Sequence, residues 1–91
     1  VIVPAYTYCA SANIVEHVGA TPVLVDILDD FTLDADDVAR KLSPATKCIM
    51  PVDVGGLPAR IDRIMALAEG NRTSFRPAAG SIPQELLGRP L

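Results

Sequence analysis

The sequence contains few aromatic residues, few cysteines and no cluster of positive charge. Among its 91 residues are no tryptophan, two tyrosines, two phenylalanines, two cysteines and one histidine. Cys9 and Cys48 lie far apart and form no CxxC pair, so we expect no structural zinc and a reducing, cytoplasmic setting. The eight Lys and Arg residues are dispersed and are outnumbered by eleven acidic residues. This balance argues against a nucleic-acid-binding surface.

Long apolar runs and the common catalytic motifs are also missing. Each apolar stretch is only a few residues long, too short for a membrane-spanning helix. We find no GxGxxG, P-loop, HExxH or GxSxG motif. The five aspartates between residues 29 and 37 lack the spacing and glycine of an EF-hand loop, so we expect capping and solvation there. Motifs therefore assign no catalytic and no metal-binding residue.

What the sequence does contain is typical of one small globular domain. Apolar residues make up 49% and charged residues 21%, which excludes a disordered chain. The chain opens on the apolar run Val1–Val3, which reads as a strand already under way, and it does not start with methionine. We therefore expect the chain to be a piece of a longer protein.

Apolar runs and helical stripes alternate along the first two thirds of the chain. The runs predict strands over 1–5, 22–27 and 47–52, and the unbroken run 22–27 predicts a strand buried on both faces. The stripes predict helices over 7–18, with Gly19 as the cap, over 34–42, with Asp34 as N-cap, and from Pro58 through Ala68. This alternation predicts an α/β fold built from right-handed βαβ units on a parallel sheet.

The last third of the chain is richer in loop residues. We divide the chain into residues 1–68, carrying the strand–helix repeats, and a tail over 69–91, with one helical turn near 84–87. Gly56 is expected to have a backbone conformation closed to residues with a Cβ. We expect His17 to be solvated, and Cys9 and Cys48 to be packed inside.

Two segments are placed to form a site. In a parallel sheet, ligands bind outside the carboxyl ends of the strands. Residues 4–8 follow the first strand there, and residues 53–56 follow the third. Tyr6 and Tyr8 put aromatic rings near a helix N-terminus, where a flat anionic ligand could stack and meet free N–H groups. The alternative is that the two tyrosines only pack.

Four blocks of sequence resemble the DegT/DnrJ/EryC1/StrS aminotransferases. They are PAYTYCASAN (4–13), GATPVLVD (19–26), SPATKCIMPV (43–52) and GLPARID (56–62). In that family the corresponding blocks read PSFTFVATANAV, GATPVFVDV, TPRTKAIMPVH and GxPADMD, in the same order and with the same spacing. The tail ends in LGRPL, which in a longer-loop branch of the family leads into a further strand.

The resemblance implies a pyridoxal-phosphate enzyme of fold type I, with this chain as part of the large domain. It places Tyr8 over the pyridine ring of the cofactor. Asp53 falls where many members have histidine, and its role stays open. Lys41 and Lys47 do not match the Schiff-base lysine, which the resemblance puts beyond Leu91, so no catalytic residue is carried over. The ring-nitrogen carboxylate would also follow Leu91, and the phosphate-binding turn would precede Val1.

The resemblance further implies a parent enzyme that transfers an amino group from glutamate to a nucleotide-linked keto-sugar, as a cytoplasmic homodimer. A fragment of this kind would be inactive alone. Two alternatives stay open at this point. One is a fold-type-I sugar dehydratase, whose lysine is replaced by histidine. The other is a small non-catalytic α/β binding or interaction module, with no nucleic-acid or membrane partner.

Overall fold

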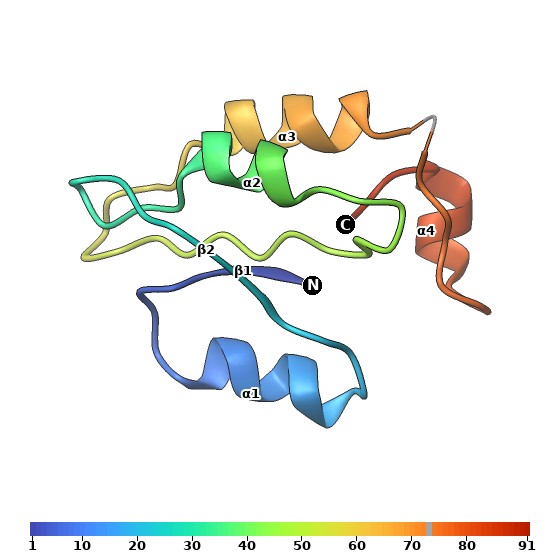
Figure 1. Ribbon diagram of the computed structural model, residues 1–91, viewed down its shortest axis with the longest axis horizontal. Coiled ribbons are helices and arrows are strands. Elements are labelled where there is room, and N and C mark those ends of the chain that lie inside the picture. The colour runs from blue at the N-terminus through green and yellow to red at the C-terminus, as the bar shows by residue number, and fades with distance from the viewer. Residues whose placement is uncertain (73) are drawn as a thin grey trace.

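The computed structural model describes residues 1–72 and 74–91, which combine helices and strands in an α/β chain (Figure 1). In chain order the elements are β1 (Ile2–Pro4), α1 (Ala10–His17), β2 (Val23–Val25), α2 (Ala35–Lys41), α3 (Ile61–Gly70) and α4 (Ile82–Leu87). No helix in these described ranges is long and apolar enough to cross a membrane.

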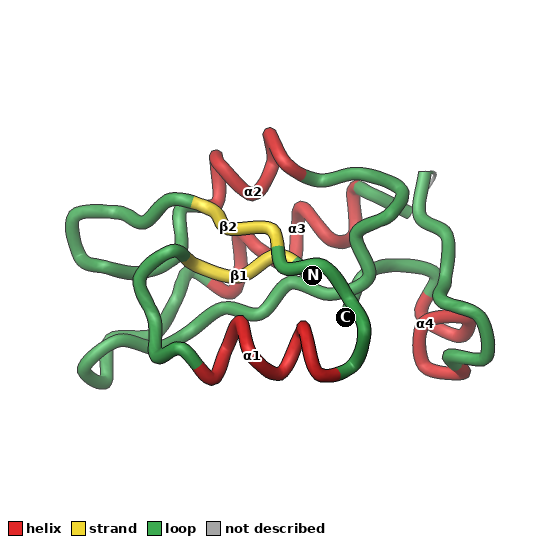
Figure 2. Tube along the Cα trace, turned by 60° about the horizontal axis from the view of Figure 1, so that its bottom comes forward, coloured by secondary structure: helices red, strands yellow, loops and turns green. Residues whose placement is uncertain are grey.

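The strands form a parallel sheet between two helical layers. Ile2 pairs with Val23 and Pro4 with Val25, in parallel register. Helices α2 and α3 lie together on one face of the sheet, while α1 lies on the other (Figures 1 and 2). The prediction of an α/β fold with a parallel sheet is confirmed.

The third predicted strand, over 47–52, is not a continuous strand. Among the described residues, its ladder contact is a parallel bridge between Ile2 and Ile49, in which the Ile2 N–H donates to the Cys48 carbonyl at 2.9 Å. Met50 N–H donates to the Ile2 carbonyl at 2.9 Å, but the next donor in this register would be Pro4, which has no N–H, so the ladder stops there. On its other side, Ile49 N–H donates to the Leu91 carbonyl at 2.8 Å. The segment thus occupies the place of a strand without its full length.

The prediction that the run 22–27 is buried on both faces is wrong. Only Val23–Val25 form β2, and Leu24 is 54% exposed whereas Val25 is buried. In the described part of the chain, β2 pairs with β1 alone and so lies at the sheet edge. Leu24 lies exposed on the face opposite Val25, although the apolar residues of this run are those of an internal strand.

The hydrophobic core lies between the sheet and the α2–α3 layer. Helix α2 contributes Val38, and α3 contributes the two buried members of its predicted stripe, Ile64 and Ala68. The other two members, Ile61 and Met65, stay exposed. The core cluster consists of Ile2, Val25, Leu33, Val38, Ile49, Ala59, Ile64 and Ala68.

Helix boundaries follow local signals in some places and not in others. Asp34 caps α2 as predicted, because its carboxylate accepts the Asp36 N–H at 2.8 Å. Gly19 has φ +73° after α1, as a helix-ending glycine requires. Pro58, however, is not the first residue of α3, which begins at Ile61 after a non-helical Arg60.

The tail carries one short helix and packs against the sheet edge. Helix α4 is longer than the predicted turn, and it ends at Gly88 in the left-handed conformation. The Lys47 ammonium lies 5.6 Å from the Phe75 ring centroid and also contacts the Arg76 carbonyl. The predicted loop over 70–74 includes Thr73, which lies outside the described residues.

Asp37 is a buried carboxylate that ties α2 to the end of β2. One of its oxygens accepts the Asp26 N–H and the Lys41 ammonium, each at 2.7 Å, and the other accepts from the Arg40 guanidinium. Lys41 also donates to the Leu24 carbonyl at 2.8 Å. The Lys41 hydrogen bond, followed by that from the Asp26 backbone, lowers the pKa of Asp37 from 3.8 to about 2.

This carboxylate makes the free energy of unfolding depend on pH. Because the pKa is lowered in the folded chain, its contribution is complete above pH 3.8 and is lost as the pH falls toward about 2. We expect Asp37→Asn to reduce stability at neutral pH and the difference from the wild type to shrink over that range. Urea unfolding against pH measures this. Asp62→Asn, an exposed first-turn residue of α3, is the control, and a pH-independent difference for Asp37→Asn would contradict the prediction.

Gly56 has the left-handed backbone that was predicted. Gly55 and Gly56 have φ +58° and +84°, and the flanking Val54 and Leu57 exchange hydrogen bonds of 3.1 and 2.9 Å. Two central residues with positive φ form the tight turn in which β-branched residues are strained.

We expect Gly56→Val to destabilise the chain by roughly 1–3 kcal/mol, since it forces a bulky residue into this region. No atom lies within 4 Å of the added Cβ, so the cost is conformational and not steric crowding. Chemical unfolding with Gly70→Ala as control checks it, because Gly70 is helical. Equal stability of the Gly56→Val and wild-type chains would count against the strain argument.

Candidate functional site

A cavity of about 510 Å³ opens at the carboxyl edge of the sheet. It is bounded on one side by the loop that follows β1 and on the other by the segment after the third strand position. This size falls within the range of small-molecule sites. The two segments that the sequence predicted to share this edge do meet there. The lining residues are Tyr6, Thr7, Tyr8, Ser11, Val52, Asp53, Val54 and Gly55.

Tyr8 lines this cavity with its side chain 80% exposed. It lies before α1 and not in its first turn, since the helix begins only at Ala10. The loop at residues 5–8 is needed to bring the chain from the end of β1 to the helix on the other face. The Tyr8 carbonyl accepts the Ser11 N–H at 3.0 Å, which fixes the loop to the helix start while the ring stays free of packing.

Polar groups complete the lining on both sides. Thr7 and Ser11 join their hydroxyl groups at 3.0 Å, one turn apart. Across the cavity, Asp53 is exposed, and one of its carboxylate oxygens accepts the Ala59 N–H at 2.9 Å. Asp53 therefore holds the 53–59 loop closed with one oxygen. Its position beside the cavity agrees with the predicted edge, while its chemical role stays open.

Phe31 brings a third loop to this edge. Its ring packs against Tyr6 with centroids 5.0 Å apart and planes tilted by 37°. The loop from β2 to α2 carries Phe31 at its tip, and Asp30 fixes the loop through Thr32. Hydrogen bonds from the Thr32 hydroxyl and backbone lower the pKa of Asp30, with a smaller contribution from Arg60.

The cysteines do not take part in this lining. Cys9 is exposed next to Tyr8, so the prediction that it is packed inside is wrong. The helix N-cap position turns it outward, and apolar neighbours in sequence did not reveal this. Cys48 is half-buried, and burial raises the pKa of its thiol. His17 is exposed, as expected.

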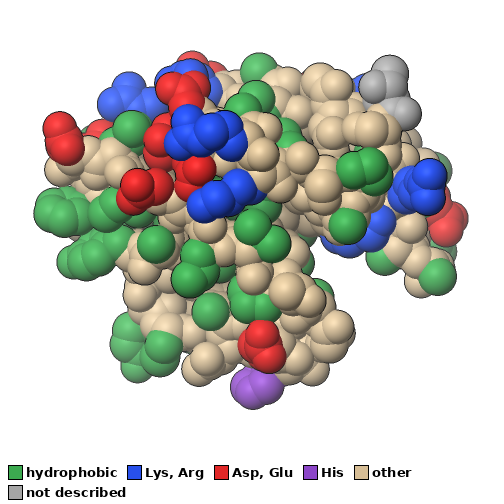
Figure 3. Space-filling view, in the orientation of Figure 1, with side chains coloured by type: hydrophobic (Ala, Val, Ile, Leu, Met, Phe, Trp, Pro, Cys, Tyr) green, Lys and Arg blue, Asp and Glu red, His purple; other side chains and the backbone are tan. Residues whose placement is uncertain are grey.

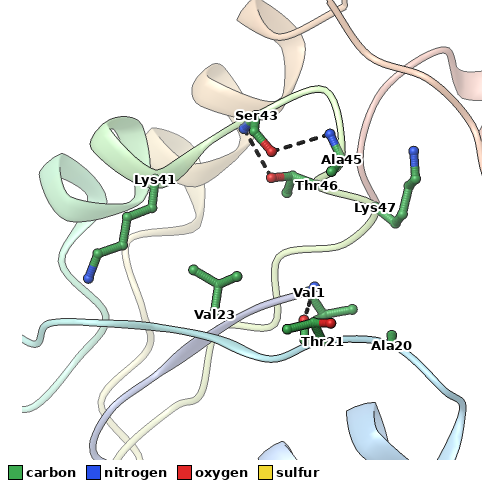
Figure 4. A pocket seen from close by; sticks show the side chains of 9 residues that line it. All are labelled: Val1, Ala20, Thr21, Val23, Lys41, Ser43, Ala45, Thr46 and Lys47. Carbon is green, nitrogen blue, oxygen red and sulfur yellow. Dashed lines mark hydrogen bonds between the residues drawn. The ribbon is translucent and has the colours of Figure 1, made fainter.

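A second cavity, of about 270 Å³, lies at the opposite, amino edge of the sheet (Figure 4). Lys41 and Lys47, the two lysines of the chain, are both at this edge. Lys41 is engaged by Asp37 and the Leu24 carbonyl, and Lys47 donates to the Pro44 and Arg76 carbonyls. Neither amine therefore reaches the cavity that Tyr8 lines.

Comparison with known proteins places this geometry in a family. The family model described as the DegT/DnrJ/EryC1/StrS aminotransferase family matches residues 1–89. The UDP-N-acetyl-3-dehydro-alpha-D-glucosamine 3-aminotransferase of Acidithiobacillus ferrooxidans is 47% identical over 70 residues, covering 76% of this chain and 19% of its own length. The GDP-perosamine synthase of Caulobacter vibrioides is 49% identical over 71 residues, covering 75% of this chain and 19% of its own length.

Solved structures that match this chain belong to the same kind of protein. A Streptococcus pneumoniae protein described as a sugar aminotransferase superposes in its PMP form with a TM-score of 0.89 and 41% identity, over 99% of this chain and 22% of that one. Its PLP form superposes with a TM-score of 0.88 and 42% sequence identity, over 97% of this chain and 22% of that one. The DesV structure from S. venezuelae superposes with a TM-score of 0.73 and 39% sequence identity, over 84% of this chain and 20% of that one.

These matches define the fold as that of the sugar aminotransferases, a family whose solved structures include pyridoxal-phosphate and PMP forms. The chain belongs to the DegT/DnrJ/EryC1/StrS aminotransferase family. It spans about a fifth of the length of the curated relatives that it matches. The resemblance drawn from the four sequence blocks is thereby confirmed.

Sequence reasoning missed part of the lining. Val52 and Val54 precede and follow Asp53, and the site prediction named neither Val52 nor Ser11. Thr7 and Ser11 are four residues apart, a spacing that places two side chains side by side at a helix, so the sequence did indicate that Ser11 lies next to Thr7. Phe31 had no such signal, because its contact with Tyr6 joins loops 25 residues apart.

Proposed function

We propose that this chain forms part of the cofactor-binding large domain of a pyridoxal-phosphate-dependent sugar aminotransferase. Residues 1–68 supply the strand–helix repeats and one side of the cofactor site, and residues 69–91 supply a branch-specific tail. The observation that carries the proposal is the cavity at the carboxyl edge, with the exposed Tyr8 ring on one side and the Asp53 loop on the other.

The residues present fit one side of a flat, polar cofactor. The Tyr8 ring offers a stacking face, because four fifths of its side chain is exposed in the cavity. The hydroxyl groups of Thr7 and Ser11 offer polar contacts beside it. When bound, pyridoxal phosphate supplies the electron sink for amino-group transfer, and the protein holds and orients it. In this chain, Tyr8 orients the ring, and the Asp53 loop limits the cavity.

Other parts of the chemistry must come from elsewhere in the polypeptide. Both lysines lie at the amino edge of the sheet, so neither can bind the cofactor in this cavity. On this proposal the 91 residues alone do not catalyse. The complete enzyme works as a homodimer in the cytoplasm, on a nucleotide-linked keto-sugar with glutamate as donor. The UDP-linked and GDP-linked sugars in the names of two relatives support the nucleotide-linked substrate, and the two free cysteines support the reducing compartment.

Purification of the full-length protein that carries this segment tests the proposal. We expect it to retain pyridoxal phosphate, seen by its absorbance, and to transfer the amino group of glutamate to a nucleotide-linked keto-sugar. On addition of glutamate, the visible absorbance of the bound cofactor should be replaced by absorbance in the near ultraviolet, without release of cofactor. A protein that binds no pyridoxal phosphate at any concentration would overturn the proposal, and one that binds it but dehydrates the sugar would overturn the transaminase assignment alone.

A further inference from the structure

Phe31 is held in an unfavourable backbone conformation at the edge that carries the cavity. Among the described residues other than glycine, it alone has a positive φ, of +66°. A bulky residue in this region is a conformational outlier, which persists only where the surroundings over-determine it. Such outliers cluster at ligand-binding and switch regions. The conformation therefore calls for an explanation beyond the turn itself.

Hydrogen bonds hold the backbone of the turn around Phe31, while the Phe31 ring stays partly exposed. Leu28 N–H donates to the Thr32 carbonyl at 2.8 Å, and Phe31 N–H donates to the Leu28 carbonyl at 2.9 Å. The Asp30 carboxylate accepts both the N–H and the hydroxyl of Thr32. Thr32 and Leu33 are buried, whereas Phe31 is 50% exposed. The turn is thus anchored in the core and projects one ring outward.

That ring meets Tyr6, which is itself a wall of the cavity. Tyr6 is 53% exposed and lines the cavity together with Tyr8. Its contact with Phe31 is a tilted aromatic pair, a geometry that stabilises two rings beyond the burial of their area. Hydrophobic side chains gather at this end of the molecule, over the loops that follow β1 and β2 (Figure 3).

The same loops are also tied to the loop after the third strand position. Asp30, beside Phe31, pairs with the Arg60 guanidinium at 3.3 Å. Asp53, on the far side of the cavity, holds the Ala59 N–H next to Arg60. The three carboxyl-edge loops are therefore connected around the cavity, by an aromatic pair on one side and an ion pair on the other.

We propose that Phe31 is a positioning residue, which holds the Tyr6 ring as a fixed wall of the cavity and so raises the affinity for the flat cofactor bound there. This inference rests on the proposed function. Phe31 itself lies outside the lining and acts through Tyr6. The strained backbone is retained because it places the ring against Tyr6.

The decisive variant is Phe31→Gly, because glycine accepts the positive φ without strain. It removes the ring contact but also relieves the backbone strain, two effects of opposite sign and similar size, so the melting temperature is expected to hold while cofactor binding weakens. In the full-length enzyme we expect pyridoxal phosphate to be retained about two- to tenfold less tightly, followed by absorbance during dialysis. Phe31→Tyr keeps an aromatic ring and is expected to restore wild-type retention.

A second measurement checks the ring contact without cofactor. The chain has two tyrosines, so their ring protons give few NMR signals, and Tyr8→Phe assigns those of Tyr6. We expect Phe31→Gly to move the Tyr6 signals toward those of a free ring and Phe31→Tyr to leave them displaced. Unchanged Tyr6 signals in Phe31→Gly would overturn the proposal.

The outcomes separate this inference from the function on which it rests. If the wild-type enzyme binds no pyridoxal phosphate, the proposed function and the role of Phe31 both fail. If it binds the cofactor and Phe31→Gly binds it equally tightly, only the role of Phe31 fails. If Phe31→Gly loses affinity only in proportion to a lowered melting temperature, Phe31 is structural, and the proposal is again overturned.

Discussion

Leu33→Ala is expected to lower the free energy of unfolding by about 2–5 kcal/mol. Leu33 is fully buried, and it belongs to the core cluster together with Ile2 and Val25. Truncation removes buried methyl groups and leaves a cavity that the surrounding helices and strands fill only in part. Because small domains have stabilities of roughly 5–15 kcal/mol, a loss of this size takes a large share of the total.

Urea unfolding of the purified chain measures this loss. The matched control is Leu86→Ala, since Leu86 is 81% exposed on α4 and its truncation should change stability by no more than about 0.5 kcal/mol. Equal losses for the two variants would show that Leu33 is not part of a packed core. Leu33 also pairs with Ile27 across the loop that presents Phe31, so the variant is expected to loosen that loop as well.

Features governed by local signals were predictable from the sequence. Asp34, with acidic residues just after it and basic residues six and seven positions later, indicated a helix, and α2 has the predicted bounds within one residue. Gly56 was predicted to have a backbone conformation closed to residues with a Cβ, and its φ of +84° confirms this. Each of these depends on the conformation of a few neighbouring residues.

Features that depend on distant partners were not predictable in the same way. The run at 22–27 has the composition of an internal strand, but what covers Leu24 depends on chain elements that its own residues do not specify. The ladder between β1 and 47–52 stops where Pro4 lacks an N–H, a limit that depends on which residues of the two segments lie opposite each other. Cys9 was predicted to be inside from its apolar neighbours, whereas the start of α1 turns it outward.

The candidate site, too, was predictable in part from the sequence and in part not. The rule that parallel strands end at one edge correctly brought the loop after β1 and the 53–56 segment to one cavity. Alternation of strands and helices is enough to apply that rule, because it requires no side-chain contact. The Tyr6–Phe31 contact does require one, and it depends on a backbone conformation that residues like phenylalanine rarely adopt.

Tyr8→Ala is expected to weaken retention of pyridoxal phosphate by up to roughly tenfold in the full-length enzyme that carries this segment. The Tyr8 ring lines the cavity and is largely exposed, so its face is available to an aromatic ligand. An offset stack of two rings contributes about 0.5–1.5 kcal/mol beyond the area buried, and 1.4 kcal/mol corresponds to one decade in affinity. Cofactor absorbance followed during dialysis measures the change.

Tyr8→Phe is the matched control, because it keeps the face of the ring and removes only the hydroxyl group. We expect it to retain cofactor almost as the wild type does, and we expect catalysis to fall less than retention in Tyr8→Ala, since the lysine and the ring-nitrogen partner are unchanged. If Tyr8→Ala holds the cofactor as tightly as the wild type, Tyr8 does not stack on it. Tyr6 is then the next candidate, because its ring lines the same cavity and is buttressed by Phe31.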